Sequence, residues 1–164
     1  MADAFLDSYD GQTTEELLAL EGEFRIDSLV LAFEQAIQGK SPESISTEES
    51  YVLAVEGLER EVNNGGYSQF FSNLSGEFVP VIEVALRSIK CPKTADITRD
   101  AIAALRLDTL TAEAVASAAL NEDESIQQAL AACDNRYFEN DEPIADRLFR
   151  WIAENRQRVR VGDA

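Results

Sequence analysis

The sequence contains no histidine, and cysteine, proline and basic residues are scarce. Its 164 residues include two cysteines, four prolines, and 14 lysines or arginines against 31 aspartates or glutamates. The absence of histidine excludes a histidine-based catalytic triad and the commonest zinc sites. Cys91 and Cys133 lack the spacing of a redox pair or a metal knuckle, so we expect both to pack as small hydrophobic side chains.

Signals for targeting, membrane insertion and phosphate binding are missing as well. The first residues, M-A-D-A-F-L-D, have neither the basic nor the apolar region of a signal peptide. No apolar run approaches the length of a membrane span. Gly39-Lys40-Ser41 resembles the end of a phosphate-binding loop, but Glu34 stands where that motif needs its first glycine. We therefore expect a cytoplasmic protein that makes no contact with a membrane.

Patterns of catalytic and metal-binding residues are equally rare. The sequence has no G-x-G-x-x-G motif and no acidic run with the central glycine of a calcium loop. Paired carboxylates are abundant, but they lie on predicted solvent-exposed faces, where their pKa values have no reason to shift. We predict a protein that is not an enzyme, with no catalytic residues, no metal site and no cofactor. A carboxylate-metal enzyme is the least favoured alternative.

Negative charge is what the sequence has in excess. The formal net charge is −17, and without histidine it changes little around neutral pH. Residues 1–61 carry a net charge of −12, residues 62–120 carry −1 and residues 121–164 carry −4. A field of this sign repels nucleic acid and membrane surfaces and attracts basic partners. Simple solubility is the alternative interpretation of the same charge.

Apolar residues recur at helical spacing along the whole chain. Capping-box patterns at Thr13–Glu16 and Ser46–Glu49 predict the starts of two helices, and Thr94 and Thr111 are expected to cap two more. No segment shows the alternating pattern of a strand. With 45% hydrophobic residues the chain has enough apolar surface to fold. We predict an all-α fold, with residues 1–164 forming a single compact domain of about seven to eight helices.

The stretch Glu61–Asn73, E-V-N-N-G-G-Y-S-Q-F-F-S-N, joins two of these helices. We expect Asn64-Gly65-Gly66 to end the first helix, with Gly65 in the left-handed region and therefore intolerant of substitution. The amides beside the turn are positioned to satisfy helix-end groups. One interpretation is a structural corner. The other is a polar pocket with aromatic walls that binds a small ligand or a peptide, using Tyr67, Gln69, Phe70 and Asn73.

Glutamates gather on the predicted helix from about Glu48 to Val62, on a sector away from its apolar line. Neighbouring helices would add further acids. We predict an acidic binding face made of Glu15, Glu16, Glu43, Glu48, Glu49, Glu56 and Glu59. Double-stranded DNA presents about one charge per 1.7 Å of its axis, so only several helices side by side, or two copies of the chain, approach that density. This pattern allows mimicry of DNA, and a solvated acidic surface is the simpler alternative.

Two blocks of the sequence resemble a known family. The segment Glu61–Asn73 is similar to the E-V-x-N-G-G-[FY]-x-Q-[FY]-[FL]-x-N signature of a bacterial all-helical domain family whose best-known member is an acidic DNA-mimic protein. The block C-D-N-R-Y-F, Cys133–Phe138, resembles the family's second block, D-x-x-[FY]-[FY]. Together they imply an alignment over about residues 45–158. The matching positions are Glu61, Asn64, Gly65, Gly66, Tyr67, Gln69, Phe70, Phe71, Asn73, Asp134 and Tyr137.

The resemblance implies a helical fold, often a homodimer, and a role in transcription regulation. In the DNA-mimic member this role is to occupy the DNA-binding face of a transcriptional regulator. We therefore expect an acidic, non-enzymatic interaction protein whose partner is a basic DNA-binding protein and which does not itself bind nucleic acid. A ligand- or peptide-binding module at the Asn-Gly-Gly corner, and an acidic domain without mimicry, are the alternatives.

Overall fold

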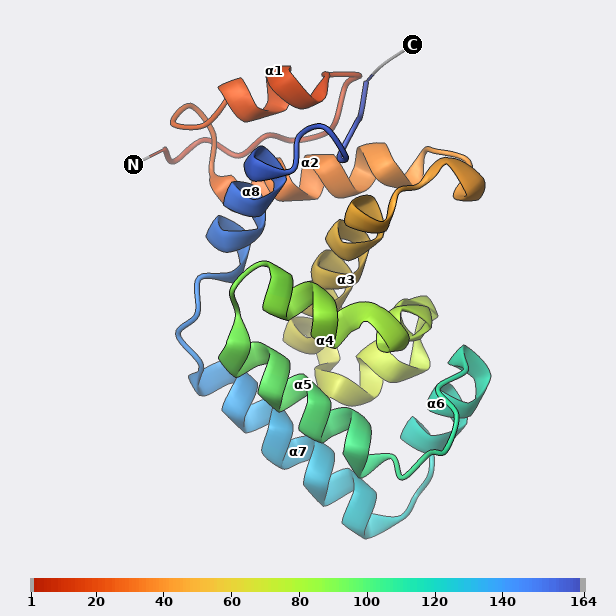
Figure 1. Ribbon diagram of the computed structural model, residues 1–164. Coiled ribbons are helices and arrows are strands. Elements are labelled where there is room, and N and C mark those ends of the chain that lie inside the picture. The colour runs from red at the N-terminus through yellow and green to blue at the C-terminus, as the bar shows by residue number, and fades with distance from the viewer. Residues whose placement is uncertain (1, 163–164) are drawn as a thin grey trace. The chain divides into compact units, whose positions relative to one another are not determined.

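Helices make up the regular structure of the computed structural model, which describes residues 2–162 (Figure 1). The α-helices are α1 (Thr14–Ala19), α2 (Ile26–Gln38), α3 (Thr47–Ser72), α4 (Val79–Ser88), α5 (Pro92–Ala104), α6 (Ala112–Ala119), α7 (Glu124–Glu139) and α8 (Ile144–Glu154). Two short 3-10 helices, η1 (Pro42–Ser44) and η2 (Leu74–Phe78), lie between them. Over the described range the only β-type pairings are isolated bridges that involve Phe24. The prediction of an all-α fold with seven to eight helices is confirmed.

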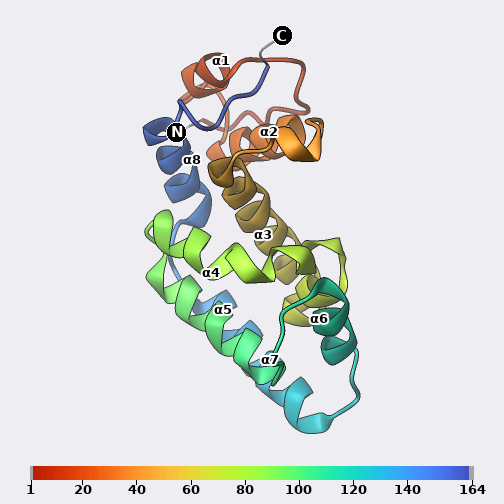
Figure 2. The same cartoon turned by 45° about the vertical axis from the view of Figure 1, so that its right-hand side comes forward.

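The contacts within the chain separate it into two compact units. The first unit consists of residues 1–56 together with residues 143–164, and the second unit consists of residues 57–142. In the first unit, α2 packs against both α1 and α8; in the second unit, α5 packs against α4 and α7, as Figures 1 and 2 both show. The prediction of a single domain over residues 1–164 stays a prediction, and each unit is described by itself.

Two helix starts in the first unit, those of α1 and α3, follow from local sequence signals. The Thr13 hydroxyl accepts the N–H of Glu16, and the Glu16 carboxylate accepts the N–H of Thr13, which confirms the predicted capping box at α1. At the start of α3 the same exchange joins Ser46 and Glu49, with N···O distances of 3.1 and 3.2 Å. Reciprocal bonds of this kind satisfy amides that the first helical turn leaves without a partner. Each box therefore fixes the residue at which its helix begins.

One predicted cap in the second unit is wrong. Thr94 does not precede α5 but lies, fully buried, in its first turn. The amides at this helix end are satisfied by the carboxylate of Glu142, which accepts from the N–H groups of Lys93 and Thr94 at 3.2 and 2.6 Å and from the Thr94 hydroxyl at 2.7 Å. Glu142 is distant in sequence, so no local pattern predicts its contact with the first turn of α5. The predicted cap of α6, Thr111, is confirmed by its bond to the N–H of Ala114.

Aromatic side chains from the end of α3 form the centre of the second unit. Tyr67, Phe70 and Phe71 are each 0% exposed. The Phe70 and Phe71 rings meet edge to face at 5.5 Å, an arrangement that aromatic pairs prefer. Cys91 and Cys133 are free thiols and both are buried, so they pack as hydrophobic side chains as predicted.

Candidate functional site

The Asn-Gly-Gly corner is a kink within α3, and its geometry differs from the prediction at one residue. Gly65 has φ −154° and ψ 18°, which is neither helical nor in the left-handed region, so the prediction of a left-handed Gly65 is wrong. Gly66 carries the positive φ instead, at 76° with ψ −174°. That combination is accessible almost only to glycine. The position that needs a positive φ is therefore one residue later than predicted. The helix continues until Asn64, and the turn is made after it.

Glu61 holds the two sides of the kink together. Its Oε2 accepts hydrogen bonds from the side-chain amides of Gln69 at 2.6 Å and Asn73 at 2.8 Å. Asn63, by contrast, donates its amide to the carbonyl of Glu59, and Asn64 is exposed. The expectation that these amides serve helix-end groups is therefore not met: Asn63 bonds a carbonyl within the helix, and Gln69 and Asn73 serve a carboxylate.

Asp134, from the second motif block, reaches the kink from α7. Its Oδ1 accepts the N–H of Tyr67 at 2.8 Å, the first amide after Gly66. Partial burial raises the pKa of Asp134, while the hydrogen bond from Tyr67 opposes that rise. The Tyr67 hydroxyl shares a buried hydrogen bond of 2.8 Å with Thr98 on α5. The corner thus joins α3, α5 and α7, which is how two blocks far apart in sequence become one feature.

A second contact between α7 and α3 involves the carboxylate of Glu59. The hydroxyl of Tyr137 donates to Glu59 Oε1. Burial raises the pKa of Glu59 to about 7, well above the ordinary value of 4.5. Its predicted place on a solvent-exposed acidic face is therefore wrong. Tyr137 itself is buried, and its ring meets the Tyr67 ring edge to face at 6.0 Å. Tyr137 therefore contacts both the aromatic core and the Glu59 carboxylate.

These contacts favour a structural role for the family-like residues. Tyr67 and Phe70, two of the four side chains proposed to line a pocket, are 0% exposed. The other two, Gln69 and Asn73, both donate to Glu61. Two of the four are therefore buried, and the other two are bonded to a neighbouring side chain. The alternative of a ligand pocket at the corner gains no support from this arrangement.

The seven glutamates of the predicted acidic face do not behave as one set. Glu15, Glu16 and Glu43 are exposed, and Glu48, Glu56 and Glu59 are intermediate. Glu15 already binds Arg160 at 2.6 Å, and this bond lowers the pKa of Glu15. Helical periodicity predicted the sector that each residue faces, but not which segments pack over that sector.

Glu49 departs furthest from the prediction, because its side chain is 2% exposed. Its carboxylate accepts two hydrogen bonds from Lys40 Nζ, at 2.9 and 2.7 Å, and one from the N–H of Arg160 at 2.9 Å. A buried carboxylate needs such partners, because its desolvation is otherwise too unfavourable. Glu49 is therefore a structural residue of the first unit and not part of an acidic binding face.

Other acids of the first unit are more accessible. Residues 2–10 run beside α2: the N–H of Arg25 donates to the carbonyl of Ala4, that of Leu6 to Ser28 Oγ, and that of Tyr9 to Gln35 Oε1. From Ser28 to Gln35 this path covers roughly 10 Å of helix axis, at about 1.5 Å per residue. The stretch carries three exposed carboxylates that form no ion pair in the described structure, and we call them the acidic row: Asp3, Asp7 and Asp10.

Sequence reasoning missed the acidic row because residues 2–10 form no helix. Its only sequence signal is the recurrence of aspartate at positions 3, 7 and 10 in a segment with no base. Folding also evens out the charge that the linear sequence concentrates in its first third. The first unit has 16 acids and 7 bases, net −9, and the second unit has 15 acids and 7 bases, net −8. The reason is that the arginine-rich end of the chain joins the first unit.

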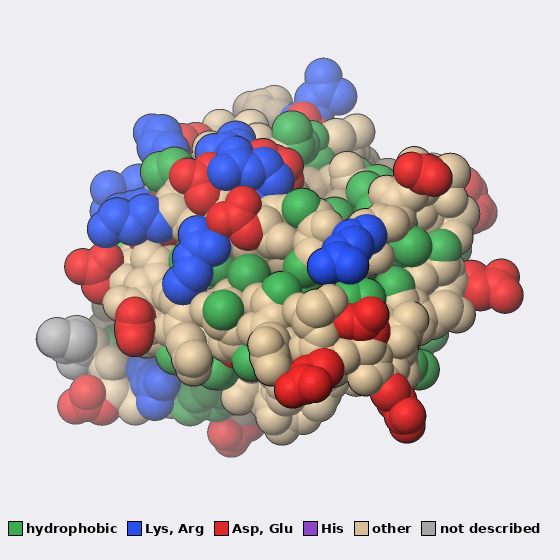
Figure 3. Space-filling model, turned by 90° about the horizontal axis from the view of Figure 1, so that it is seen from below, with side chains coloured by type: hydrophobic (Ala, Val, Ile, Leu, Met, Phe, Trp, Pro, Cys, Tyr) green, Lys and Arg blue, Asp and Glu red, His purple; other side chains and the backbone are tan. Residues whose placement is uncertain are grey.

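The second unit does not present a uniformly acidic surface. Figure 3, which views the molecule from below, shows lysines and arginines in among the acids on that face. Ion pairs in the second unit join basic residues of α4 and α7 to acids of α5. Arg87 binds Asp96 at 2.7 Å, and Arg136 binds Asp100 at 2.8 Å. Charges neutralised in pairs make a poor copy of a nucleic-acid backbone.

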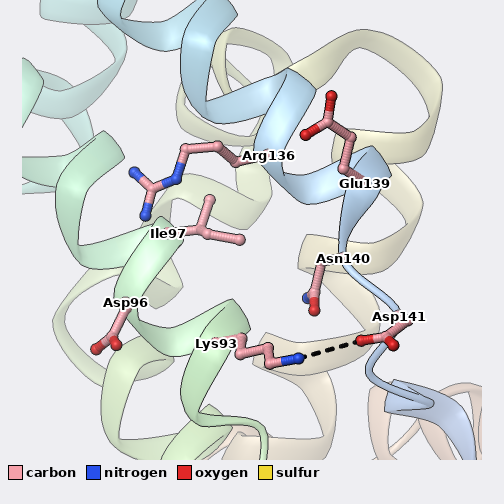
Figure 4. Close-up of a pocket in the computed structure, with 7 residues that line it drawn as sticks. All are labelled: Lys93, Asp96, Ile97, Arg136, Glu139, Asn140 and Asp141. Atoms are coloured by element: carbon pink, nitrogen blue, oxygen red, sulfur yellow. Dashed lines mark hydrogen bonds and ion pairs between the residues drawn. The ribbon is translucent and has the colours of Figure 1, made fainter.

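A shallow hollow between α5 and α7 carries mixed charges (Figure 4). Lys93 binds Asp141 at 3.3 Å across it, Arg136 is engaged by Asp100, and Asp96 binds Arg87 and Arg99. Because Lys93, Asp96, Arg136 and Asp141 are paired with one another or with their neighbours, the hollow offers no concentrated charge to a ligand.

Two further properties bear on the class of site. Among the described residues, no group of three or more cysteine, aspartate or glutamate side chains is arranged to hold a metal ion. No described helix combines the length and the apolar character needed to cross a bilayer.

A family model described as DMP19-like protein matches residues 43–155. Both motif blocks fall inside that range, whereas the acidic row, α1 and α2 lie before it. No curated protein and no solved structure matches the chain.

Proposed function

The chain belongs to the DMP19-like protein family, and from that premise we propose that it is a non-enzymatic, acidic interaction protein that occupies the DNA-binding face of a basic DNA-binding protein. The observation that carries this proposal is the net charge of −17 combined with exposed carboxylates that form no ion pair. Such carboxylates attract a cationic surface at long range.

The acidic row is the contact surface that we propose. Asp3, Asp7 and Asp10 are exposed along a segment anchored to α2 by hydrogen bonds of 2.7 to 3.1 Å. An anchored row holds its charges at fixed spacing, as the phosphates of DNA are held. The row alone is sparser than one charge per about 1.7 Å, the density of duplex DNA. Further exposed acids of the first unit add to it, namely Glu16, Glu21, Glu23 and Glu43.

Binding and competition by DNA test the proposal. The tagged protein is incubated with host lysate at low and at high salt, and proteins that it retains are identified by mass spectrometry. We expect one or two DNA-binding proteins that both duplex DNA and salt release, because the contact is mainly between charges. Retention of partners that are indifferent to DNA and to salt would contradict the proposal.

A matched pair of variants separates the acidic row from net charge. The triple variant Asp3→Asn, Asp7→Asn, Asp10→Asn and a control triple, Asp108→Asn, Glu113→Gln, Glu122→Gln, each remove three exposed acids. Both proteins therefore keep the same net charge. We expect the first triple to weaken binding of the purified partner at least tenfold more than the control does. Equal losses would show that overall charge, and not the acidic row, determines binding.

A further inference from the structure

The last described stretch of the chain leaves a turn at residues 155–158 and is held in place by side chains from other segments. It follows α8, and Figures 1 and 2 both show it running close to α1. We call Arg158–Val161 the C-terminal strap. Val159 and Val161 are buried, at 0% and 3% exposure, whereas Arg158 is exposed. From Val159 to Val161 the side chains are buried, intermediate and buried, the alternation of an extended segment with one apolar face.

Thr14, the first residue of α1, binds the strap on both sides of Arg160. Its hydroxyl donates to the carbonyl of Val159 at 2.7 Å and accepts the N–H of Val161 at 3.0 Å. Thr14 itself is 0% exposed. One buried hydroxyl thus pairs a donor and an acceptor of the strap that water does not reach, and leaving either group unpaired would be costly.

Three further side chains bind the strap backbone. Glu49 accepts the N–H of Arg160 at 2.9 Å, and Lys40 donates to the carbonyl of Arg160 at 3.1 Å. Ser46 donates its hydroxyl to the carbonyl of Arg158 at 2.6 Å. The strap thus receives from side chains the kind of backbone pairing that an extended peptide otherwise takes from the edge of a sheet.

The side chains of the strap supply selectivity. Backbone bonds accept almost any residue, so recognition of sequence depends on the two buried valines and on the cation between them. The guanidinium of Arg160 binds the carboxylate of Glu15 at 2.6 Å. The site is therefore selective for an apolar, β-branched residue, followed by a cation and then by a second β-branched residue.

We propose that this site binds extended basic segments of the pattern valine-arginine-valine, that the strap occupies it in cis, and that a basic segment of a partner protein docks by displacing the strap. The site consists of Thr14, Glu15, Lys40, Ser46 and Glu49. Three of its five residues, and the strap itself, lie outside the range that matches the family. The proposal does not rest on DNA mimicry, because most of the contacts reach the peptide backbone rather than a charge.

The test uses the full chain with a weakened strap. A segment joined to its own site competes at high effective concentration, so the parent protein should bind an added peptide weakly. Val161→Ser removes one buried valine and leaves the five residues of the site unchanged. The probe is a peptide with blocked ends, Gln-Arg-Val-Arg-Val-Gly. The control peptide has serine in place of both valines and the same charge. Binding and the exchange of strap amides are followed by NMR.

We expect the Val161→Ser protein to bind the valine peptide at least tenfold more tightly than the parent does, with shifts at the amides of Ser46 and Glu49. It should bind the serine peptide at least tenfold more weakly than the valine peptide. Adding Thr14→Val should abolish this binding, whereas Thr14→Ser, which keeps the hydroxyl, should preserve it. If Val161→Ser prevents folding, Val161→Ala gives the same comparison.

Two results would overturn the proposal. One is a Val161→Ser protein whose strap amides exchange faster than in the parent but which does not bind the valine peptide. The other is equal binding of the two peptides, since charge alone would then account for it. Raising the salt concentration to about 0.5 M distinguishes this site from charge mimicry, because screening weakens a contact between exposed charges far more than buried backbone hydrogen bonds.

Discussion

The carboxylate of Asp134 occupies the space that a side chain on Gly66 would need. A Cβ built on Gly66 would lie 2.8 Å from Asp134 Cγ, closer than real Cβ atoms come to a neighbour. The same carboxylate accepts the N–H of Tyr67, so it cannot withdraw without losing a hydrogen bond at the kink. A strained backbone and a fixed neighbour therefore both demand glycine at this position.

Gly66→Ala should lower the free energy of unfolding by roughly 2–4 kcal/mol, because it combines a positive φ with a clash. Gly65→Ala is the matched control. A Cβ there would also be too close to its neighbour, at 2.8 Å from Gln69 Cδ, but that neighbour belongs to a flexible side chain and the φ of Gly65 is negative. We expect a loss of roughly 1 kcal/mol. Urea unfolding measures both values, and a larger loss for Gly65→Ala would contradict this account of the kink.

Glu59 should make stability depend on pH. Burial raises its pKa in the folded protein to about 7 from an unfolded value near 4.5. A raised pKa means that the folded state binds the proton more tightly, so this stabilisation is complete below pH 4.5 and is lost as the pH rises through 7. The loss is at most about 3 kcal/mol. Glu59→Gln, which stays neutral, should abolish this dependence and unfold at higher urea than the parent at pH 8. The prediction is wrong if the free energy of unfolding changes between pH 5 and pH 8 by the same amount in Glu59→Gln as in the parent.

Removal of the Glu49 carboxylate should destabilise the first unit. Glu49→Ala leaves the ammonium of Lys40 and the N–H of Arg160 without their shared acceptor. Losing one partner of a buried ion pair costs roughly 3–5 kcal/mol. Glu48→Ala, at the adjacent and more exposed position, should cost less than about 0.5 kcal/mol. Thermal unfolding of both variants checks the contrast. Similar losses of stability in the two variants would mean that the contacts of the Glu49 carboxylate do not stabilise the first unit.

Glu142 should stabilise α5 in the manner of a helix cap. Glu142→Ala removes the acceptor of two first-turn amides and of the Thr94 hydroxyl, so we expect a loss of roughly 1–2 kcal/mol. Burial favours a raised pKa for this carboxyl, but the hydrogen bonds from Thr94 and Lys93 outweigh it and lower the pKa of Glu142. Its stabilising effect is therefore lost only as the pH falls through that lowered value. Amide exchange at Lys93 and Thr94 reports the cap directly, and unchanged protection in the variant would argue against it.

Local patterns predicted the helices and their starts better than they predicted the site. Thr13, Ser46 and Thr111 are caps because each side chain reaches the amide three residues further on, and such local contacts can be predicted from the sequence. Thr94 fails as a cap because α5 already begins at Pro92, and Glu142, on another segment, accepts the amides of Lys93 and Thr94. The kink was expected at the right motif, but the choice between Gly65 and Gly66 depends on where α7 places Asp134.

The candidate site could be predicted only where exposure follows from local sequence. Glu49 and Glu59 lie on the sector of α3 opposite its apolar line, and helical periodicity alone predicts solvent there. Arg160 and Lys40 cover the first, and Tyr137 meets the second, so both carboxylates lose water to segments far away in sequence. The acidic row was overlooked for the converse reason: an extended segment anchored by side chains has no periodicity that reveals it.

The division of the chain also constrains the order in which its parts are made. The first unit is assembled from residues 1–56 and 143–164, whereas the second is one continuous stretch. On the ribosome, domains generally fold in the order in which they emerge. Here residues 1–56 cannot complete their packing until the strap has been made, because Thr14 and Glu49 have no strap to bind before then. During translation the second unit has all of its own residues earlier, and through that interval Glu15 lacks Arg160, which later binds it.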